Sequence, residues 1–472
     1  MKKIFIMFLL CLPLLFLSCT ADQPAAPKLD VTTSQLALSK MVAIGNSLTA
    51  GFQSAGMMED FQVNSYPYLV AQQMGKEEFE QPTISTPGIG STPGYTPYYL
   101  DANGDITLDP LEINPLFLLK NALLSRPYDN LGVPGADLND LLTTIDGSKG
   151  NPFFDMILRN PNLGNTTQLE QAVMLQPSLV LLWAGNNDVL GAALDGGDLD
   201  QITSQADFDQ RITGVVHQLR TDLPRSLIIM ANIPDVSDIP YINILDSIFV
   251  DGEPKIFGTD LRPYDVPGGY LPLLTVETNV KHVTLPGLMA YQEGYGVPDS
   301  TYMVDVLHKS SVFARLIQNL MISNGLYPKG VPLPGNMTLT ESESNTILAA
   351  VQGFNAKIVE VATAYQIPLI DANSMLTELN MNGIDGASGR FVLVDPATTA
   401  FSLDGVHPNN AGYAIIANAF IDMINAVLEL DQDIPKVDVS TKLGQYLPAP
   451  GKITVTRAID SASLIFHRSN AN

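Results

Sequence analysis

Ser47 stands in a setting suited to nucleophilic chemistry. It follows the apolar run 42–44 and Gly45, and Asn46 and Thr49 beside it are residue types that cap helices. The pattern predicts a buried strand, a tight turn and a helix start, the place where open α/β sheets bind ligands. A serine there is more often a plain helix cap, and its hydroxyl is a poor nucleophile until a base takes its proton. The rest of the chain must therefore supply its partners.

A candidate base and its carboxylate stand close together far along the chain. The chain has five histidines, and His407 is preceded three positions earlier by Asp404, with Gly405 between them. This spacing lets the loop fold back so that the carboxylate meets one imidazole nitrogen and leaves the other for Ser47. Taken alone, Asp-x-x-His is common and mostly structural, but here it precedes a predicted long helix.

Acyl chemistry at a serine also needs hydrogen-bond donors aimed at the developing oxyanion. The sequence Gly-Asn-Asn-Asp at 185–188 closes the most apolar strand-like run, so Asn187 is expected at the same edge of the sheet as Ser47. Gly135 follows another short strand, where its N–H could approach a ligand. Each of these residues, in isolation, would be a turn glycine or a helix-capping asparagine.

The elements that must position these residues alternate between strands and helices. Such alternation predicts parallel βαβ units and an α/β domain. Two stretches rich in Pro, Gly and aromatic residues interrupt it, at about 80–127 and 237–340, and we expect the first to shape a pocket. The expected strands are 42–44, 178–184, 226–232 and 367–371, with a further strand that runs into a glycine turn over 128–136. The expected helices are 66–74, 137–142, 201–223, 341–365 and 410–430.

The four stretches together resemble the SGNH, or GDSL, hydrolases, which are named for blocks that carry Ser, Gly, Asn and His. The matching residues are 45–49, 130–135, 185–188 and 404–409. The resemblance implies a three-layer αβα, flavodoxin-like doubly wound parallel sheet. It also implies Ser47 as nucleophile, His407 as base and Asp404 as its orienting acid. The N–H groups of Ser47 and Gly135 and the side chain of Asn187 would form the oxyanion hole. Asn46 departs from the family, which usually has Asp there.

The first residues resemble a bacterial lipoprotein signal. Lys2 and Lys3 precede an apolar stretch, 4–17, and a small residue then precedes Cys19. The only other cysteine, Cys11, lies inside the apolar stretch, so we expect Cys19 to carry a lipid. The predicted segments are a signal peptide at 1–18, a tether at 19–37, a hydrolase domain at 38–430 and an extension at 431–472. The expected location is the bacterial cell envelope.

Composition limits the partners. The formal net charge of −24 over 472 residues argues against nucleic-acid binding, which would need a basic stripe. Residues 101–112 place oxygen-bearing side chains at calcium-loop spacing, but the turn glycine stands at position 4 instead of 6. A solvated turn is the favoured interpretation, and no metal or organic cofactor is expected.

The sequence therefore predicts an esterase that hydrolyses carboxylic esters through an acyl-enzyme at Ser47. A glycan O-acyl ester and a lipid or phospholipid ester remain open as substrates. The alternative is a non-catalytic, membrane-anchored binding lipoprotein that keeps the fold.

Overall fold

The computed structural model describes residues 36–102, 105–160, 162–428, 430, 432–445 and 454–455. The predicted signal peptide, the lipid-bearing Cys19 and nearly all of the predicted tether lie outside these residues.

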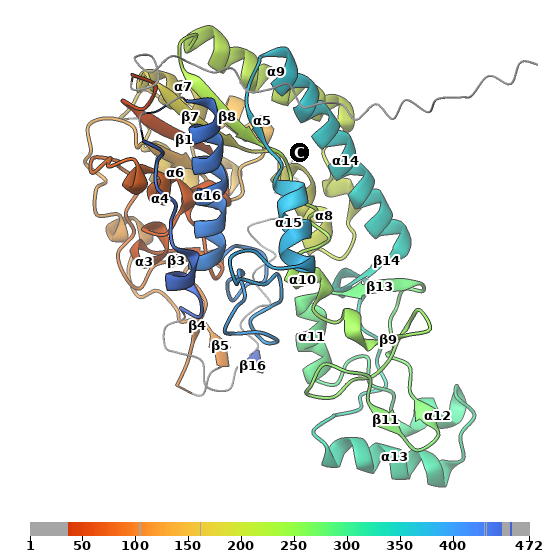
Figure 1. The fold of residues 1–472 in the computed structure, drawn as a ribbon. Coiled ribbons are helices and arrows are strands. Elements are labelled where there is room, and N and C mark those ends of the chain that lie inside the picture. The colour runs from red at the N-terminus through yellow and green to blue at the C-terminus, as the bar shows by residue number, and fades with distance from the viewer. Residues whose placement is uncertain are drawn as a thin grey trace, which may run out of the picture.

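A five-stranded parallel sheet forms the centre of the fold (Figure 1). Its strand order, β15-β8-β7-β1-β6, begins with a β1–β6 pair and then continues outward from the other side of β1. This is the flavodoxin-like doubly wound order. Every residue of β1, β7 and β8 is buried, as expected of strands covered on both faces. The strands are β1 (Met41–Gly45), β6 (Asn130–Gly132), β7 (Leu179–Trp183), β8 (Leu227–Ala231) and β15 (Leu369–Ile370).

Helices cover both faces, so the predicted three-layer αβα architecture is confirmed. On one face α16 packs against α4, β8 and β15, and on the other α9 packs against α5, α7 and α14. Asp137 caps α5, because its carboxylate accepts from the N–H of Asp140 in a capping box. The helices are α4 (Tyr66–Gln73), α5 (Leu138–Thr143), α6 (Phe153–Leu158), α7 (Gln168–Met174), α8 (Asn187–Leu194), α9 (Gln205–Asp222), α14 (Glu341–Ala364), α15 (Ala372–Met381) and α16 (Asn410–Val427).

Among the described helices, α14 alone is long and apolar enough to cross a membrane by length and composition. One side of α14 packs against the protein interior. Phe354 of α14 stacks on Phe208 of α9 with ring centroids 3.9 Å apart. Its buried residues recur at the helical period and cover this face of the sheet.

The first predicted insertion forms a small β-rich layer beside the sheet. Its β3 pairs antiparallel with β2, and its β5 lies between β4 and β16. The bounds are β2 (Gly56–Met57), β3 (Ile89–Gly90), β4 (Tyr99–Leu100), β5 (Asp105–Thr107) and β16 (Thr454–Val455), with the short helix α3 (Glu59–Gln62) and the 3-10 helix Pro115–Leu118 nearby.

The second predicted insertion extends as a lobe away from the sheet, at the lower right of Figure 1. Its β13 pairs antiparallel with β14, which leads directly into α14. The chain therefore leaves the sheet after β8 and returns to it through α14. The lobe contains α10 (Pro240–Asn243), β9 (Phe249–Val250), β10 (Glu253–Pro254), β11 (Asp265–Val266), β12 (Gly269–Tyr270), β13 (Val280–Val283), α11 (Leu285–Gln292), α12 (Ser300–Asp305), α13 (Ser311–Ser323) and β14 (Thr338–Thr340).

Residues after α16 pack back on it. The side-chain amides of Asn418 and Asn425 bond the backbone of Val437 and Ile434.

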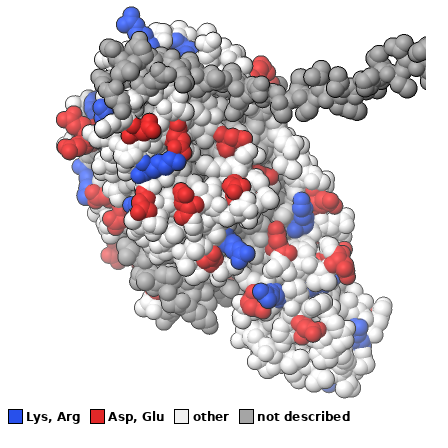
Figure 2. All heavy atoms as spheres, in the orientation of Figure 1, with Lys and Arg blue, Asp and Glu red and all other residues white. Residues whose placement is uncertain are grey.

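On the face shown in Figure 2, acidic and basic side chains are interspersed and most of the visible surface is uncharged.

Candidate active site

Ser47 lies just after the carboxyl end of β1, in a turn that has room only for glycine at position 45. A Cβ on Gly45 would lie 2.2 Å from both the hydroxyl of Thr49 and the carbonyl oxygen of Trp183. Asn46 then caps the short helix α2 (Ser47–Ala50) by accepting from the N–H of Leu48 at 3.1 Å. The predicted strand, tight turn and helix start are thus all present.

The position of Ser47 in the sheet is the one that open α/β folds use for ligands. The chain passes from β1 to β6 on one side and then to β7 on the other, so the strand order reverses at β1. Loops diverge at such a reversal and leave a crevice at the carboxyl ends of the strands. Ser47 follows β1, and Asn186 and Asn187 follow the neighbouring β7.

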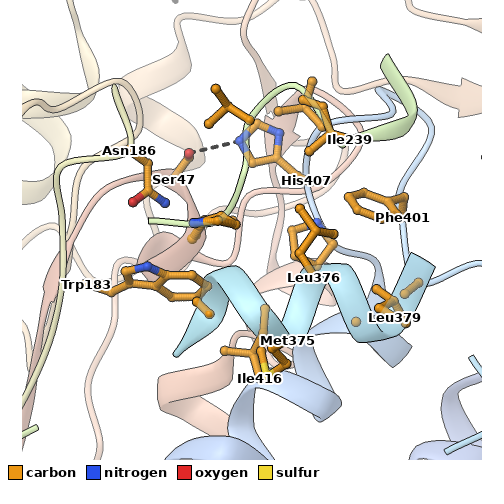
Figure 3. A pocket seen from close by; sticks show the side chains of 18 of the residues that line it. Ser47, Trp183, Asn186, Ile239, Met375, Leu376, Leu379, Phe401, His407 and Ile416 are labelled. Atoms are coloured by element: carbon orange, nitrogen blue, oxygen red, sulfur yellow. Dashed lines mark hydrogen bonds between the residues drawn. The ribbon is translucent and has the colours of Figure 1, made fainter. Parts of the chain in front are cut away.

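The structure brings His407 to Ser47 although the two are 360 residues apart. Nε2 of His407 lies 2.9 Å from Oγ of Ser47, and both residues are almost fully buried (Figure 3). Phe52 packs against the imidazole ring with centroids 4.8 Å apart. The loop that carries His407 ends at Asn409, whose side chain caps α16 through the N–H groups of Ala411 and Gly412.

Asp404 holds the other side of the imidazole. Its Oδ2 lies 2.9 Å from Nδ1 of His407, and its Oδ1 accepts from the backbone N–H groups of Val406 and His407, each at 2.8 Å. Burial by itself raises the pKa of this carboxyl group. The charge of His407 and the hydrogen bonds from His407 and Val406 outweigh burial, so the pKa lies below its usual value. Asp404 is therefore held as a carboxylate.

Two further groups that bind Asp404 were not predicted from the sequence. The N–H of Ala55 donates to Oδ2 at 2.6 Å, and the hydroxyl of Ser402 donates to Oδ1 at 3.1 Å. Ser54 and Ala55 both adopt left-handed backbone conformations, with φ of 50° and 56°. Such values are uncommon outside glycine and asparagine, and here they turn the N–H of Ala55 toward the carboxylate. Ser402 could have been suspected from its place two residues before Asp404.

Asn187 and Gly135 lie in adjacent loops. The side-chain amide of Asn187 donates to the carbonyl oxygen of Ala136 at 2.8 Å, which ties the start of α8 to the turn after β6. Gly135, the next residue back, has φ of 79°, in the left-handed region that favours glycine. Asn187 lines the same pocket as Ser47, whereas Gly135 is not among the described residues of its wall.

Three asparagines around Ser47 each leave one buried amide atom without a partner among the described residues. These atoms are Nδ2 of Asn46, Oδ1 of Asn186 and Oδ1 of Asn187. All three residues line the pocket that contains Ser47 and His407, and Figure 3 shows Asn186 beside Ser47. Buried polar atoms are nearly always hydrogen-bonded, so such a cluster of exceptions marks a place where a ligand can supply partners.

The first insertion shapes a cavity, but not the one that contains Ser47. None of its described residues lines the cavity at Ser47. Its residues Tyr98 and Ser91 instead donate backbone hydrogen bonds to Ser54 and Ala55, and the insertion lines a separate cavity together with Ser402. These bonds hold the insertion against the loop that supports Asp404, and it therefore does not cover Ser47.

No cluster of three or more potential metal-ligating side chains occurs within the described residues. The stretch 101–112, for which a solvated turn was favoured over a calcium loop, includes residues 103 and 104, which lie outside them. Tyr99, just before this stretch, donates its hydroxyl hydrogen to the carboxylate of Asp109 within it at 2.7 Å.

Comparison with known proteins gives one family match. Residues 41–264 match the family model described as GDSL-like Lipase/Acylhydrolase. The match includes Ser47, Gly135 and Asn187 and ends before Asp404. No curated protein sequence matches the chain.

Several solved structures resemble the chain at low sequence identity. An α/β hydrolase, LAE5, from the metagenome of Lake Arreo is 13% identical, with 82% of this chain and 96% of that chain covered and a TM-score of 0.34. An acetyl-xylooligosaccharide esterase from Geobacillus is 11% identical, with coverages of 82% and 94% and a TM-score of 0.31. A lipase/acylhydrolase from Enterococcus faecalis is 12% identical, with coverages of 83% and 98% and a TM-score of 0.30.

Proposed function

We propose that this protein, whose residues 41–264 match the GDSL-like lipase/acylhydrolase family model, is a serine esterase that cleaves carboxylic esters through an acyl-enzyme at Ser47. The observation that carries this proposal is the hydrogen-bonded chain from Ser47 through His407 to Asp404. Nucleophile, base and orienting carboxylate are within hydrogen-bond reach of one another, which is the geometry that activates a serine.

In the first half of the reaction, Nε2 of His407 accepts the proton of Ser47 as Oγ attacks the ester carbonyl carbon. Asp404 accepts from Nδ1–H of His407, fixes the tautomer that leaves Nε2 free as a base, and stabilises the imidazolium that forms. His407 then returns the proton to the leaving alcohol oxygen, and the carbon–oxygen bond to the alcohol breaks. An acyl group remains on Ser47.

In the second half, water loses a proton to Nε2 of His407 and attacks the acyl carbonyl. The bond to Oγ of Ser47 breaks, Oγ takes the proton back, and the free acid leaves. Each step uses side chains of this protein and one water molecule.

The oxyanion that forms in both halves needs donors. An amide NH₂ group has two hydrogens, and the bond to Ala136 uses only one of those on Asn187. We assign the second hydrogen to the oxyanion, together with the N–H groups of Ser47 and Gly135. The N–H of Ser47 is at the first position of α2, where helix geometry provides no acceptor. Removing one such donor typically costs about 10²–10³ in kcat.

The test is hydrolysis of p-nitrophenyl butyrate by Ser47→Ala. We expect kcat to fall by at least about a thousandfold, because the remaining groups stabilise the oxyanion but provide no nucleophile. Ser440→Ala is the matched control, since Ser440 is exposed and bonds only Asp438. Undiminished hydrolysis by folded Ser47→Ala would reject the proposal.

We also propose that the enzyme is anchored in the bacterial cell envelope through lipid on Cys19. The support is the sequence pattern around 4–19 alone. Incorporation of labelled palmitate into the full chain, and its loss in Cys19→Ser, is the measurement that tests it.

A further inference from the structure

The pocket that contains Ser47 has a polar end and an apolar end. At the polar end are Ser47, His407 and the asparagines at 46, 186 and 187. The rest of the wall comes from the end of β7, from α8, from loop 234–239, and from α15 and α16. In Figure 3, Leu376 and Leu379 of α15 and Ile416 of α16 extend the pocket away from the hydrogen-bonded Ser47 and His407.

The far wall is uniformly hydrophobic. Met375, Leu376 and Leu379 are spaced so that they share one face of α15, and Ile415 and Ile416 face them from α16. Among the described lining residues none is Asp, Glu, Lys or Arg. A sugar or a charged acyl group would lose its hydration here without finding hydrogen-bond partners, which is costly.

An acetyl group would fill only the polar end. Its single methyl group lies next to the carbonyl carbon that Ser47 attacks, so Leu376, Leu379 and Ile416 would have no ligand to contact. An aliphatic acyl chain, in contrast, would remove their apolar surface from water, which is worth about 0.8 kcal/mol per buried methylene.

The size of the cavity limits the shape of the acyl group. Its volume is about 100 Å³, smaller than the roughly 150 Å³ apolar cavity that accepts a benzene ring in another protein. At roughly 30 Å³ for each water-sized group, this volume holds about three methylene or methyl groups beyond the ester carbonyl. The cavity therefore has room for a short unbranched chain of about four or five carbons.

We propose that this pocket binds the acyl part of the substrate as a short unbranched aliphatic chain of about four or five carbons, with Leu379 setting the chain length. This inference rests on the proposed esterase function. It selects a short-chain aliphatic acyl ester over a glycan acetate as the substrate class.

Two series of esters test the proposal. In the first, the alcohol is p-nitrophenol and the acyl group runs from acetate to palmitate. We expect kcat/KM to rise at least about tenfold from acetate to butyrate and to fall for chains longer than hexanoate, because buried methylenes add binding energy until the cavity is full. In the second, the acyl group is acetate and the alcohol runs from ethanol to decanol, and we expect a change below about threefold.

Leu379→Trp and Leu379→Ala test the assigned residue. Tryptophan fills the far end, so the ratio of kcat/KM for butyrate to that for acetate should fall at least about tenfold. Alanine lengthens the cavity, so the optimum should move to hexanoate or longer. Met381→Trp is the control, since Met381 is on the same helix but is 75% exposed and outside the wall. The ratio of kcat/KM for two substrates, measured on one sample, does not depend on the fraction of the protein that is folded.

Three results would overturn the inference: a preference for acetate, chain-length dependence only in the alcohol series, or equal ratios in Leu379→Trp and Met381→Trp. Its failure is distinguishable from failure of the esterase proposal. If Ser47→Ala removes hydrolysis but acetate is preferred, only the acyl-chain assignment is wrong. If Ser47→Ala hydrolyses esters normally, the esterase proposal itself is wrong.

Discussion

Replacing Asp404 with asparagine removes one acceptor from a carboxylate whose two oxygens are both occupied. Oδ2 accepts from Ala55 N–H and faces Nδ1 of His407, and Oδ1 accepts from the N–H groups of Val406 and His407. Asparagine has one oxygen and one NH₂ group. In either orientation its NH₂ group must therefore face at least two former donors.

The magnitude follows from that count. Two hydrogen bonds to a charged group are lost, each worth about 1.5–3 kcal/mol, so the free energy of unfolding should fall by about 3–6 kcal/mol. Without its acceptor, the Nδ1–H of His407 no longer fixes the catalytic tautomer. The equivalent change in a serine protease lowers kcat about 10⁴-fold, so we expect a fall of about 10³–10⁴ here.

The assay is kcat for p-nitrophenyl butyrate at pH 7, with urea unfolding of the same samples to measure the folded fraction. Asp395→Asn is the matched control. That carboxylate accepts from the backbone N–H of Thr398 and the hydroxyl of Ser388, but it has no bond to His407. The kcat of Asp395→Asn should stay within about twofold of the native value. A kcat for folded Asp404→Asn within tenfold of the native enzyme would refute the role given to Asp404.

Three further outcomes follow from the same geometry. Asn46→Asp should keep kcat within about threefold. The carboxylate still accepts from Leu48 N–H, and the substitution removes a buried Nδ2 atom that has no partner among the described residues. Steady-state kinetics and thermal unfolding of this variant are the measurements. Gly45→Ala should abolish soluble expression or lower the free energy of unfolding by about 3 kcal/mol or more. The Cβ of the alanine would clash with the carbonyl oxygen of Trp183. Urea unfolding measures this loss. The lowered pKa of Asp404 means that its stabilisation is complete above the unfolded value of 3.8 and is lost as the pH falls through the folded value. Native protein should therefore lose stability more steeply below pH 4 than Asp404→Asn does, as acid titration of urea unfolding would show.

The residues that the structure brings together at Ser47 could be predicted from sequence because their signals are local. An apolar run ending in Gly45 identifies the strand and turn at Ser47, and the spacing of Asp404, Gly405 and His407 identifies a loop that folds back. Burial of every residue in β1 and β7 is likewise visible as unbroken apolar runs. The family resemblance then linked segments that are far apart in the chain.

The pocket wall could not be predicted in the same way. α15 was missed, although Met375, Leu376 and Leu379 have helical spacing, because polar residues alternate with them along a short segment. The bond from Ala55 N–H to Asp404 joins residues 349 positions apart and depends on left-handed conformations that Ser54 and Ala55 do not signal. Both features arise from tertiary packing.

The first insertion shows the same limit. Its Pro, Gly and Tyr content indicated loop structure correctly, but composition does not say which side of the active-site loop it covers. Backbone bonds from Ser91 and Tyr98 decide that, and they direct the insertion to the loop supporting Asp404.

The most direct test of the central claim, an activated serine at position 47, is labelling by a fluorophosphonate. The phosphorus atom is attacked by a serine oxygen whose proton has been taken by a base, so labelling reports activation independently of the ester substrate. Mass spectrometry of digested, folded protein should place a single adduct on Ser47, with labelling slowed at least about a hundredfold in His407→Ala. An unlabelled Ser47, or equal labelling rates in the native protein and His407→Ala, would contradict the account.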